Sequence, residues 1–353
     1  MSGRTPRLRR VRRFVPSVRT TKGATPKVVA LGGGMGLSAS LAALRRITGD
    51  LTAVVTVADD GGSSGRLRDE LGVLPPGDLR KALAALCGDD DWGQTWARVI
   101  RHRFQSEGEL HDHAVGNLLI VALWEQLGDH VQALDLVGRL LGAHGRVLPM
   151  SAVPLELQAQ VRGHDPARPD DVSTVRGQAT VALTPGEVLA VHVVPEEPPA
   201  VPEAVAAVRD ADWVVLGPGS WFSSVIPHLL VPELREALEE TKARKVLSLN
   251  LAPQPGETDG FSPQRHLEVL ARHAPKLAFD VVLADRAAVP DIDGLTVAAK
   301  QLVGSEVELA AVAAQGDDAR PGAGGAPDRH DPELLAAAYD RIFRMHGRIG
   351  PWR

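Results

Sequence analysis

The spacing of apolar residues after residue 26 predicts a strand, a glycine turn and a helix. Residues 27–31 form a short apolar run that stops at Gly32-Gly33-Gly34, and apolar residues then recur at helical spacing over 37–47. A second, β-branched run covers residues 51–58. A strand, a helix and another strand within about 30 residues form a βαβ unit. This unit predicts a parallel sheet that is buried on both faces.

Farther along the chain the pattern becomes helical from residue 78 to about residue 148, and strand signals return after it. We expect helices at 79–86, 92–104 and 116–127, and strands at 180–183, 187–194, 213–216, 245–249 and 280–284. Two of these strands end in polar, glycine-bearing loops, at 217–220 and 254–260. The pattern therefore predicts an α/β fold with a helical section attached to the sheet.

Four segments are expected. Residues 1–26 form a basic, disordered tail, and residues 27–315 form the α/β domain. Residues 316–331 have low complexity and no apolar period, which predicts a flexible linker. Pro332 stands where a helix can start, and the amphipathic pattern over 334–345 predicts that residues 332–353 provide a C-terminal helix that docks on the α/β domain.

Composition narrows the class of protein. The chain has 353 residues and a single cysteine, Cys87, so it has no intramolecular disulfide and no cysteine metal cluster. This usage fits a reducing cytosol, and we expect a cytoplasmic protein in which Cys87 belongs to the core. No apolar run approaches the roughly 20 residues that a membrane-spanning helix needs.

The net charge of −5 is the sum of two regions of opposite charge. Residues 1–27 hold nine cations and no acid, which leaves 30 cations against 44 acids, a charge of −14, for the remainder. An acidic body repels a phosphate backbone, so we expect no nucleic-acid binding by the folded part. The tail is interpreted as a solvated extension, with contact to an anionic partner as the alternative.

The first glycine loop, Gly32-Gly33-Gly34-Met35-Gly36, carries the clearest chemical signal. It joins a strand to a helix, where unpaired N–H groups and the positive end of the helix dipole favour a phosphate. No Gly-Lys-Ser/Thr follows, which excludes a P-loop. Gly34, Gly36 and Ala39 satisfy the looser dinucleotide pattern, but a tight structural turn would use the same glycines.

The second signal is Asp59-Asp60, at the end of the next strand. Two adjacent carboxylates can hold Mg²⁺ through water or accept bonds from ribose and sugar hydroxyls. Arg66 and Arg80 can offer forked donors to a phosphate. The alternatives are that Arg66 is simply solvated, and that the nearby Asp78 caps the helix that begins at Leu79.

Other candidate groups give weaker signals. His111 and His113 have a spacing that can ligate a metal on a strand, but no third ligand is evident. A loop histidine that positions Asn117 or lies near the ligand is favoured instead. Ser220 follows Gly217-Pro218-Gly219 without the pattern of a nucleophile elbow. We therefore predict no catalytic nucleophile and no protein metal site.

Together the motifs resemble the gluconeogenesis factor family (YvcK-like), relatives of 2-phospho-L-lactate transferase (CofD-like). The matching motifs are 28–38, 57–68, 74–80, 113–118, 216–220, and Asn250 with 254–260. Several long motifs in register are far more specific than one glycine loop. The sequence departs from the usual family pattern at Met35, at Trp221-Phe222 and at Ala252-Pro253.

The resemblance implies a Rossmann-like three-layer fold whose pocket, at the carboxyl ends of the strands, binds a UDP-sugar such as UDP-N-acetylglucosamine. It implies a cytoplasmic, non-catalytic regulator that links gluconeogenic growth to cell shape and envelope synthesis. It further suggests a homodimer and a regulatory protein partner, and no required cofactor, although Mg²⁺ can accompany the nucleotide. The expected phosphate-binding residues are Gly32, Gly33, Gly34, Met35, Gly36, Leu37 and Ser220; the expected sugar, ribose or cation contacts are Asp59, Asp60, Asn117 and Asn250; Arg66 and Arg80 are further phosphate contacts.

Two alternatives from other classes remain. One is a Mg²⁺-dependent transferase in which Asp59 or Asp60 binds the metal and Arg80 stabilises the transferring phosphate. The other is an NAD-dependent oxidoreductase, which rests on the loose glycine pattern and has no evident hydride partner. Binding and turnover with nucleoside diphosphate conjugates, or with NAD, distinguish them.

Overall fold

The computed structural model describes residues 25–315 and 329–346. Seven strands form its main sheet: β1 (Lys27–Gly32), β2 (Asp50–Val55), β3 (Arg146–Pro149), β7 (Trp213–Leu216), β8 (Arg244–Ser248), β9 (Val281–Asp285) and β10 (Glu306–Ala310). Their order across the sheet is β10-β9-β8-β7-β1-β2-β3, and every pair is parallel. The order reverses between β1 and β7, and such a switch point opens a crevice at the carboxyl ends of the strands.

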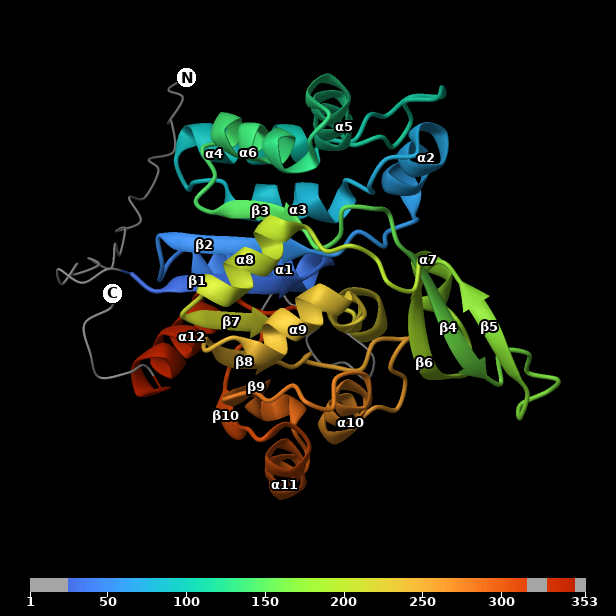
Figure 1. Cartoon of the computed structure of the whole chain (residues 1–353), viewed down its shortest axis with the longest axis vertical. Coiled ribbons are helices and arrows are strands. Elements are labelled where there is room, and N and C mark those ends of the chain that lie inside the picture. Colours follow the sequence, from blue (N-terminus) through green and yellow to red (C-terminus); the bar gives the residue numbers. More distant parts are fainter. Residues whose placement is uncertain (1–24, 316–328, 347–353) are drawn as a thin grey trace, which may run out of the picture.

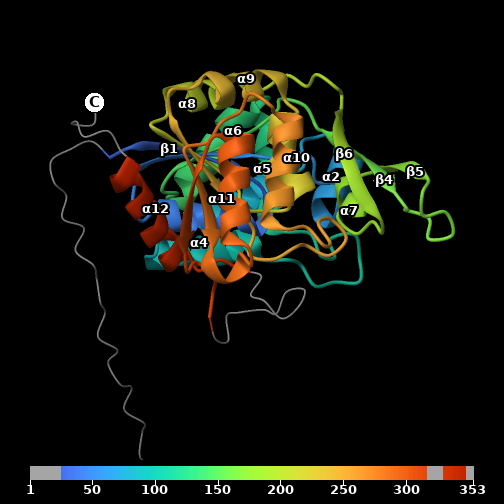
Figure 2. The same cartoon turned by 90° about the horizontal axis from the view of Figure 1, so that it is seen from below.

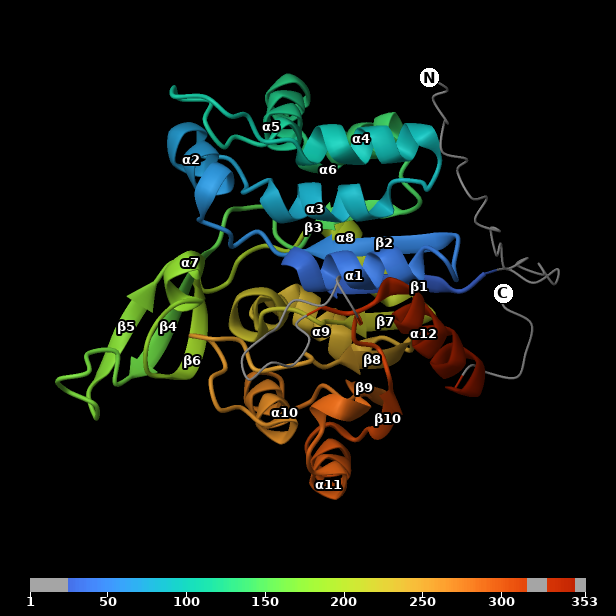
Figure 3. The ribbon, with the colours of Figure 1, turned by 180° about the vertical axis from the view of Figure 1, so that it is seen from behind.

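Helices cover both faces of the sheet (Figures 1 and 3). The helices α1 (Gly34–Leu44), α3 (Gly77–Leu86) and α12 (Pro332–His346) lie on one face, and α8 (Pro202–Asp210) and α9 (Pro232–Glu240) lie on the other, as the view from below also shows (Figure 2). The central strands are almost wholly buried, as expected of a doubly covered parallel sheet. The predicted Rossmann-like three-layer fold is confirmed.

The predicted helical section stands above the β3 end of the sheet in Figure 1. It consists of α4 (Asp91–Arg101), α5 (Val115–Leu127) and α6 (His130–Leu141), while α2 (Gly62–Leu71), α10 (Pro263–His273) and α11 (Ile292–Val303) complete the longer helices. The α2 helix begins at Gly62, shortly after Asp59 and Asp60, where the sequence analysis predicted no helix. Within the described ranges no helix is long and apolar enough to span a membrane.

A small antiparallel sheet, of order β5-β4-β6, projects from the side of the molecule (Figure 1). Its strands are β4 (Glu156–Arg162), β5 (Val172–Arg176) and β6 (Glu187–Val194). The strand predicted at 180–183 is wrong, because the chain forms the short helix α7 (Gln178–Val181) and a turn there. The apolar run is too short to establish a period, and Asp60 accepts a hydrogen bond from the amide of Ala179 in the first turn of α7 (2.8 Å).

The C-terminal helix α12 packs beside α1. The hydroxyl of Tyr339 is 3.0 Å from Ser40 Oγ, and the ring of Phe343 stacks on Trp213 with centroids 4.3 Å apart. Most of the predicted linker (316–328), the predicted tail up to residue 24 and residues 347–353 lie outside the described residues. At the described end of that linker, Arg329 O accepts a hydrogen bond from Ala314 N (2.8 Å), so this end pairs with the chain after β10.

We expect Tyr339→Phe to lower the free energy of unfolding by about 1 kcal/mol, because it removes one buried hydroxyl that bonds α12 to α1. Urea denaturation measures this loss. Ser40→Ala tests the same contact from the other side, and the double variant should cost less than the sum of the two single changes. Additive costs would show that Tyr339 and Ser40 do not interact.

Candidate functional site

A cavity of about 610 Å³ opens at the carboxyl ends of the central strands. Three loops form most of its wall. They are Gly33–Gly36 after β1, Pro218–Ser220 after β7, and the chain from Asn250 to Glu257 after β8. The cavity therefore lies beside the switch point between β1 and β7, where ligands of open α/β sheets bind.

The glycine loop packs tightly against its neighbours. A Cβ added to Gly36 would lie 2.2 Å from the carbonyl oxygen of Pro218, and one added to Gly33 would lie 2.5 Å from Thr56 Cγ2. Only a residue without a side chain fits at these two positions. Gly36 thus allows the loops after β1 and β7 to meet at the cavity.

The structure distinguishes among the amides of this loop. The amide of Gly34 donates to Asp78 Oδ2 (2.9 Å), and the amide of Leu37 donates to Gly33 O (3.2 Å). The amides of Met35 and Gly36, in the first turn of α1, have no hydrogen-bond acceptor among the described residues. These two amides of the first helical turn are therefore free to bind an anion at the positive end of the helix dipole.

Asp59 lies near Asp78 beneath this loop. A Cβ on Gly77, the neighbour of Asp78, would lie 2.9 Å from Asp59 Oδ2. Burial raises the pKa of Asp59, and the negative charge of Asp78 adds to the effect. Lys81 Nζ is 2.7 Å from Asp78 Oδ1 and partly balances the two carboxylates.

Within residues 25–315 and 329–346, no three metal-binding side chains come together. Asp59 and Asp78 would supply two carboxylate groups at most. Mg²⁺ commonly uses one or two carboxylates together with substrate phosphates and water. Both oxygens of Asp78 already have partners, Gly34 N and Lys81 Nζ, so a Mg²⁺ ion that arrived with a nucleotide would have to displace one of them to bind both acids.

Asp60 points away from its neighbour Asp59. Its Oδ1 accepts the hydrogen bond from Ala179 N, and a Cβ on Gly177 would lie 2.2 Å from its Oδ2. Asp60 therefore connects the main sheet to α7 and the small sheet. The carboxylates of Asp59 and Asp60 therefore lie apart, because the side chains of these two consecutive residues point in different directions.

Arg80 and Asn117 belong to one buried network. Arg80 Nε donates to Asn117 Oδ1 (2.8 Å), and Asn117 Nδ2 donates to Ser63 Oγ (3.0 Å). The ring of His113 completes the network, with Nδ1 3.1 Å from Ser63 Oγ, so Ser63 connects this histidine to Asn117.

The Arg80 side chain is only 5% exposed, and no carboxylate of the described residues lies within 4 Å of it. Burial, followed by the charge of Arg103, lowers the pKa of Arg80 to about 10. A buried guanidinium without an acidic partner is costly, and an anionic ligand would relieve that cost.

Two other predicted residues have local partners. The guanidinium of Arg66 is exposed and donates to the carbonyl oxygen of His111 (2.7 Å), so it holds the loop before α5. Asn250 exchanges two hydrogen bonds of 2.9 Å with the backbone of Gly219, and Gln254 Nε2 is 3.1 Å from Ser220 Oγ. Asn250 thereby fixes the loop after β7, and Ser220 stays at the cavity wall.

Comparison with known proteins identifies the family. The family model described as 2-phospho-L-lactate transferase CofD matches residues 28–319. A putative gluconeogenesis factor of Mycobacterium leprae is 51% identical over 323 residues, which cover 91% of this chain and 87% of that protein. The chain belongs to the gluconeogenesis factor family, the YvcK-like relatives of CofD. The resemblance noted in the sequence is thus confirmed.

Two more distant members of the family also match most of the chain. The gluconeogenesis factor of Bacillus subtilis is 36% identical over 269 residues, which cover 76% of this chain and 81% of that protein. A crystal structure of a UPF0052 family protein from Bacillus halodurans is 31% identical, with a TM-score of 0.77, and the match covers 89% of this chain and 99% of that one.

Three of the positions where this chain departs from the usual family pattern have different environments. Trp221 and Phe222 are fully buried, and they pack edge-to-face on His266 and Phe261. Met35 is 61% exposed at the rim of the cavity. The two aromatic changes therefore affect the core, whereas Met35 can affect ligand contact.

Three titratable lining residues of this family member were not identified from the sequence as site residues. Glu257 accepts the amide of Ser223 (2.8 Å), and burial raises its pKa to about 7. Arg329 and His330 also line the cavity, and burial lowers the pKa of His330 to about 4. The motif 254–260 was a signal for Glu257, but Arg329 and His330 stand at the end of a low-complexity segment and gave none.

Proposed function

We propose that this protein binds a UDP-sugar of the UDP-N-acetylglucosamine type at the glycine-loop cavity. In this proposal it is a cytoplasmic, non-catalytic regulator that links growth on gluconeogenic carbon to cell shape and envelope synthesis. It would act as a homodimer through a regulatory protein partner. The observation that carries the binding proposal is the pair of free amides, Met35 and Gly36, at the head of α1 inside a cavity of about 610 Å³.

The ligand is expected to be a nucleoside diphosphate sugar because of its charge and size. The diphosphate would bind the two amides and Ser220, in a body whose net negative charge provides no general attraction for anions. The volume lies within the usual range for small-molecule sites. Gln254 and Asn250 hold the opposite wall in place for the uridine and sugar.

The buried network around Arg80 supports a second anionic contact. Its guanidinium lacks a carboxylate partner among the described residues, and Asn117 orients it. A phosphate or an acidic group of the ligand would provide that partner. Asp59 would accept hydroxyl groups of the sugar or ribose, or would bind Mg²⁺ that comes with the nucleotide.

Calorimetric titration tests the proposal. We expect UDP-N-acetylglucosamine to release heat on binding and to raise the melting temperature, and we expect NAD, which has a diphosphate but no UDP-sugar, to bind much more weakly. The absence of heat and of any thermal shift with UDP-N-acetylglucosamine, UDP-glucose and UDP would contradict the proposal. Such a result would leave the assignment of the fold unchanged.

The proximity of Asp59 and Asp78 favours one alternative function, a Mg²⁺-dependent transferase of the CofD type. In that case a nucleotide conjugate would turn over only with Mg²⁺, and Asp59→Asn would stop turnover while nucleotide still binds. No turnover across a panel of such conjugates would leave the regulator as the better proposal.

A further inference from the structure

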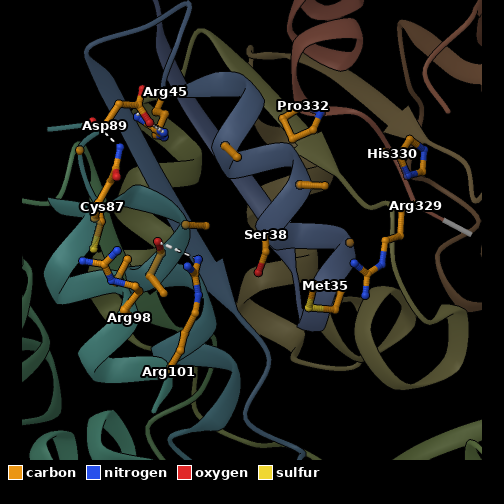
Figure 4. Close-up of a pocket in the computed structure, with 18 residues that line it drawn as sticks. Met35, Ser38, Arg45, Cys87, Asp89, Arg98, Arg101, Arg329, His330 and Pro332 are labelled. Carbon is orange, nitrogen blue, oxygen red and sulfur yellow. Dashed lines mark hydrogen bonds and ion pairs between the residues drawn. The ribbon is translucent and has the colours of Figure 1, made fainter. Parts of the chain in front are cut away.

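A second cavity, of about 540 Å³, runs along the outer side of α1 (Figure 4). Its walls come from α1, α3, α4 and the segment that leads into α12. At one end it meets the glycine-loop cavity, since Met35, Gly36, Arg329 and His330 line both. The rest of its lining is separate, so the two cavities share one wall.

The lining of this second cavity is cationic although the folded part of the chain is acidic overall. Arg45, Arg98, Arg101 and Arg329 line it, and Asp89 is the acidic residue among the lining side chains. Asp89 is already paired with Arg45, at 2.5 Å. The lining therefore has an excess of positive charge.

The two arginines of α4 have only neutral partners among the described residues. Arg98 donates to Thr95 Oγ1 (3.4 Å), and Arg101 donates to the carbonyl oxygen of Ala84 (3.0 Å). They are three residues apart and so lie on one face of the helix, where Figure 4 shows them side by side. Both guanidinium groups keep donors for a further acceptor.

Arg45, which directly follows α1, lines the same cavity as Arg98 and Arg101. Its side chain is 10% exposed, and its Nε is buried without a partner among the described residues. Burial raises the pKa of the neighbouring Cys87 thiol, and the charges of Arg101 and Arg45 oppose that rise. The charges of Arg45 and Arg101 therefore both reach Cys87, which lines the cavity.

Between these cations the floor is made of small side chains. The alanines that line the cavity are Ala39, Ala42, Ala84, Ala85 and Ala97. A tetrahedral phosphate has oxygens that point in several directions, so the neighbouring guanidinium groups of Arg98 and Arg101 on one face of α4 can each bind a different oxygen. The alanine floor leaves room for a compact body next to the phosphate.

We propose that the cavity between α1 and α4 is a second binding site, selective for a small phosphorylated molecule that Arg98 and Arg101 contact directly. This site does not depend on the UDP-sugar proposal, because its lining is largely separate from the glycine-loop cavity. A ligand here would touch the wall formed by Arg329 and His330, so it would lie next to the UDP-sugar.

Calorimetry with inorganic pyrophosphate tests this site on the full chain. We expect wild type to bind pyrophosphate, both alone and with UDP-N-acetylglucosamine present, and more tightly than it binds citrate. The Arg98→Gln/Arg101→Gln variant should bind at least about 30-fold more weakly, because two charge-assisted contacts are lost. Both side chains are exposed on α4, so this variant is expected to fold.

A matched variant controls for net charge. Arg209→Gln/Arg272→Gln removes the same charge from exposed positions of α8 and α10 and should bind pyrophosphate as wild type does. Several results would overturn the proposal. The first two are no binding of pyrophosphate by wild type and equal pyrophosphate binding by wild type and the Arg98/Arg101 variant. The others are an equal loss of pyrophosphate binding in the control variant, full competition by UDP-N-acetylglucosamine, and citrate binding as tight as that of pyrophosphate.

Discussion

Replacing Gly36 with alanine should lower the free energy of unfolding by about 3 kcal/mol and remove UDP-sugar binding. The new Cβ would lie 2.2 Å from the carbonyl oxygen of Pro218 and 2.7 Å from Cα of Gly219. Both are backbone atoms, so the clash is relieved only if the first turn of α1 moves away from the loop after β7. The amides of Met35 and Gly36 would then shift relative to Ser220, and a diphosphate could not contact both walls.

A second helical glycine provides the control. Gly138 lies within α6, and the nearest heavy atom to an added Cβ is 3.8 Å away, so Gly138→Ala should stabilise the protein by up to about 1 kcal/mol. Urea denaturation measures both variants, and calorimetry with UDP-N-acetylglucosamine measures binding. A Gly36→Ala protein with wild-type stability and affinity would show that the loops after β1 and β7 do not need this close contact.

The buried carboxyl of Glu257 should make the free energy of unfolding fall as the pH rises from 4.5 to about 7. Burial raises the pKa of Glu257 from 4.5 to about 7 in the folded protein. Between these values the folded state holds a proton that the unfolded state has lost, so deprotonation favours unfolding. This contribution is fully present below pH 4.5 and lost above pH 7, and it amounts to about 3 kcal/mol.

Glu257→Gln isolates this effect, because glutamine keeps the shape of the side chain and does not titrate. Buried histidines such as His228 and His330 have lowered pKa values and change stability in the opposite direction, so the quantity to measure is the difference between wild type and Glu257→Gln at each pH. Glu125→Gln, at an exposed position of α5, controls for the loss of one charge. A constant difference from pH 5 to pH 8 would contradict the assignment.

The same buried group connects pH to the binding site. Glu257 lines the glycine-loop cavity and accepts the amide of Ser223, next to the loop that carries Ser220. Ionisation of this carboxyl would place a negative charge in the cavity wall, where it would repel a bound diphosphate. Affinity for UDP-N-acetylglucosamine should therefore fall in the same pH range in wild type and stay flatter in Glu257→Gln.

Much of the central fold was predictable because its signals are local. The strands β1, β2, β7 and β8 each begin within two residues of the start that the apolar runs predicted. The glycine turn lies between β1 and α1 as expected. A parallel sheet buried on both faces leaves continuous apolar runs that a sequence displays directly. Of the small sheet only β6 was predicted, and β4 was missed although its residues alternate polar and apolar over seven positions, which is the signal of a half-buried strand.

The sequence by itself determined the α/β class, the glycine loop and the acids after β2, since each depends on residues adjacent in the chain. The tertiary structure alone decided which of these groups face one cavity. It turned Asp60 toward α7, placed Asp78 on the amide of Gly34, and brought Arg329 and His330 to the wall from the far end of the sequence. Side-chain direction and contacts between distant segments depend on packing of the whole chain, which no local pattern encodes.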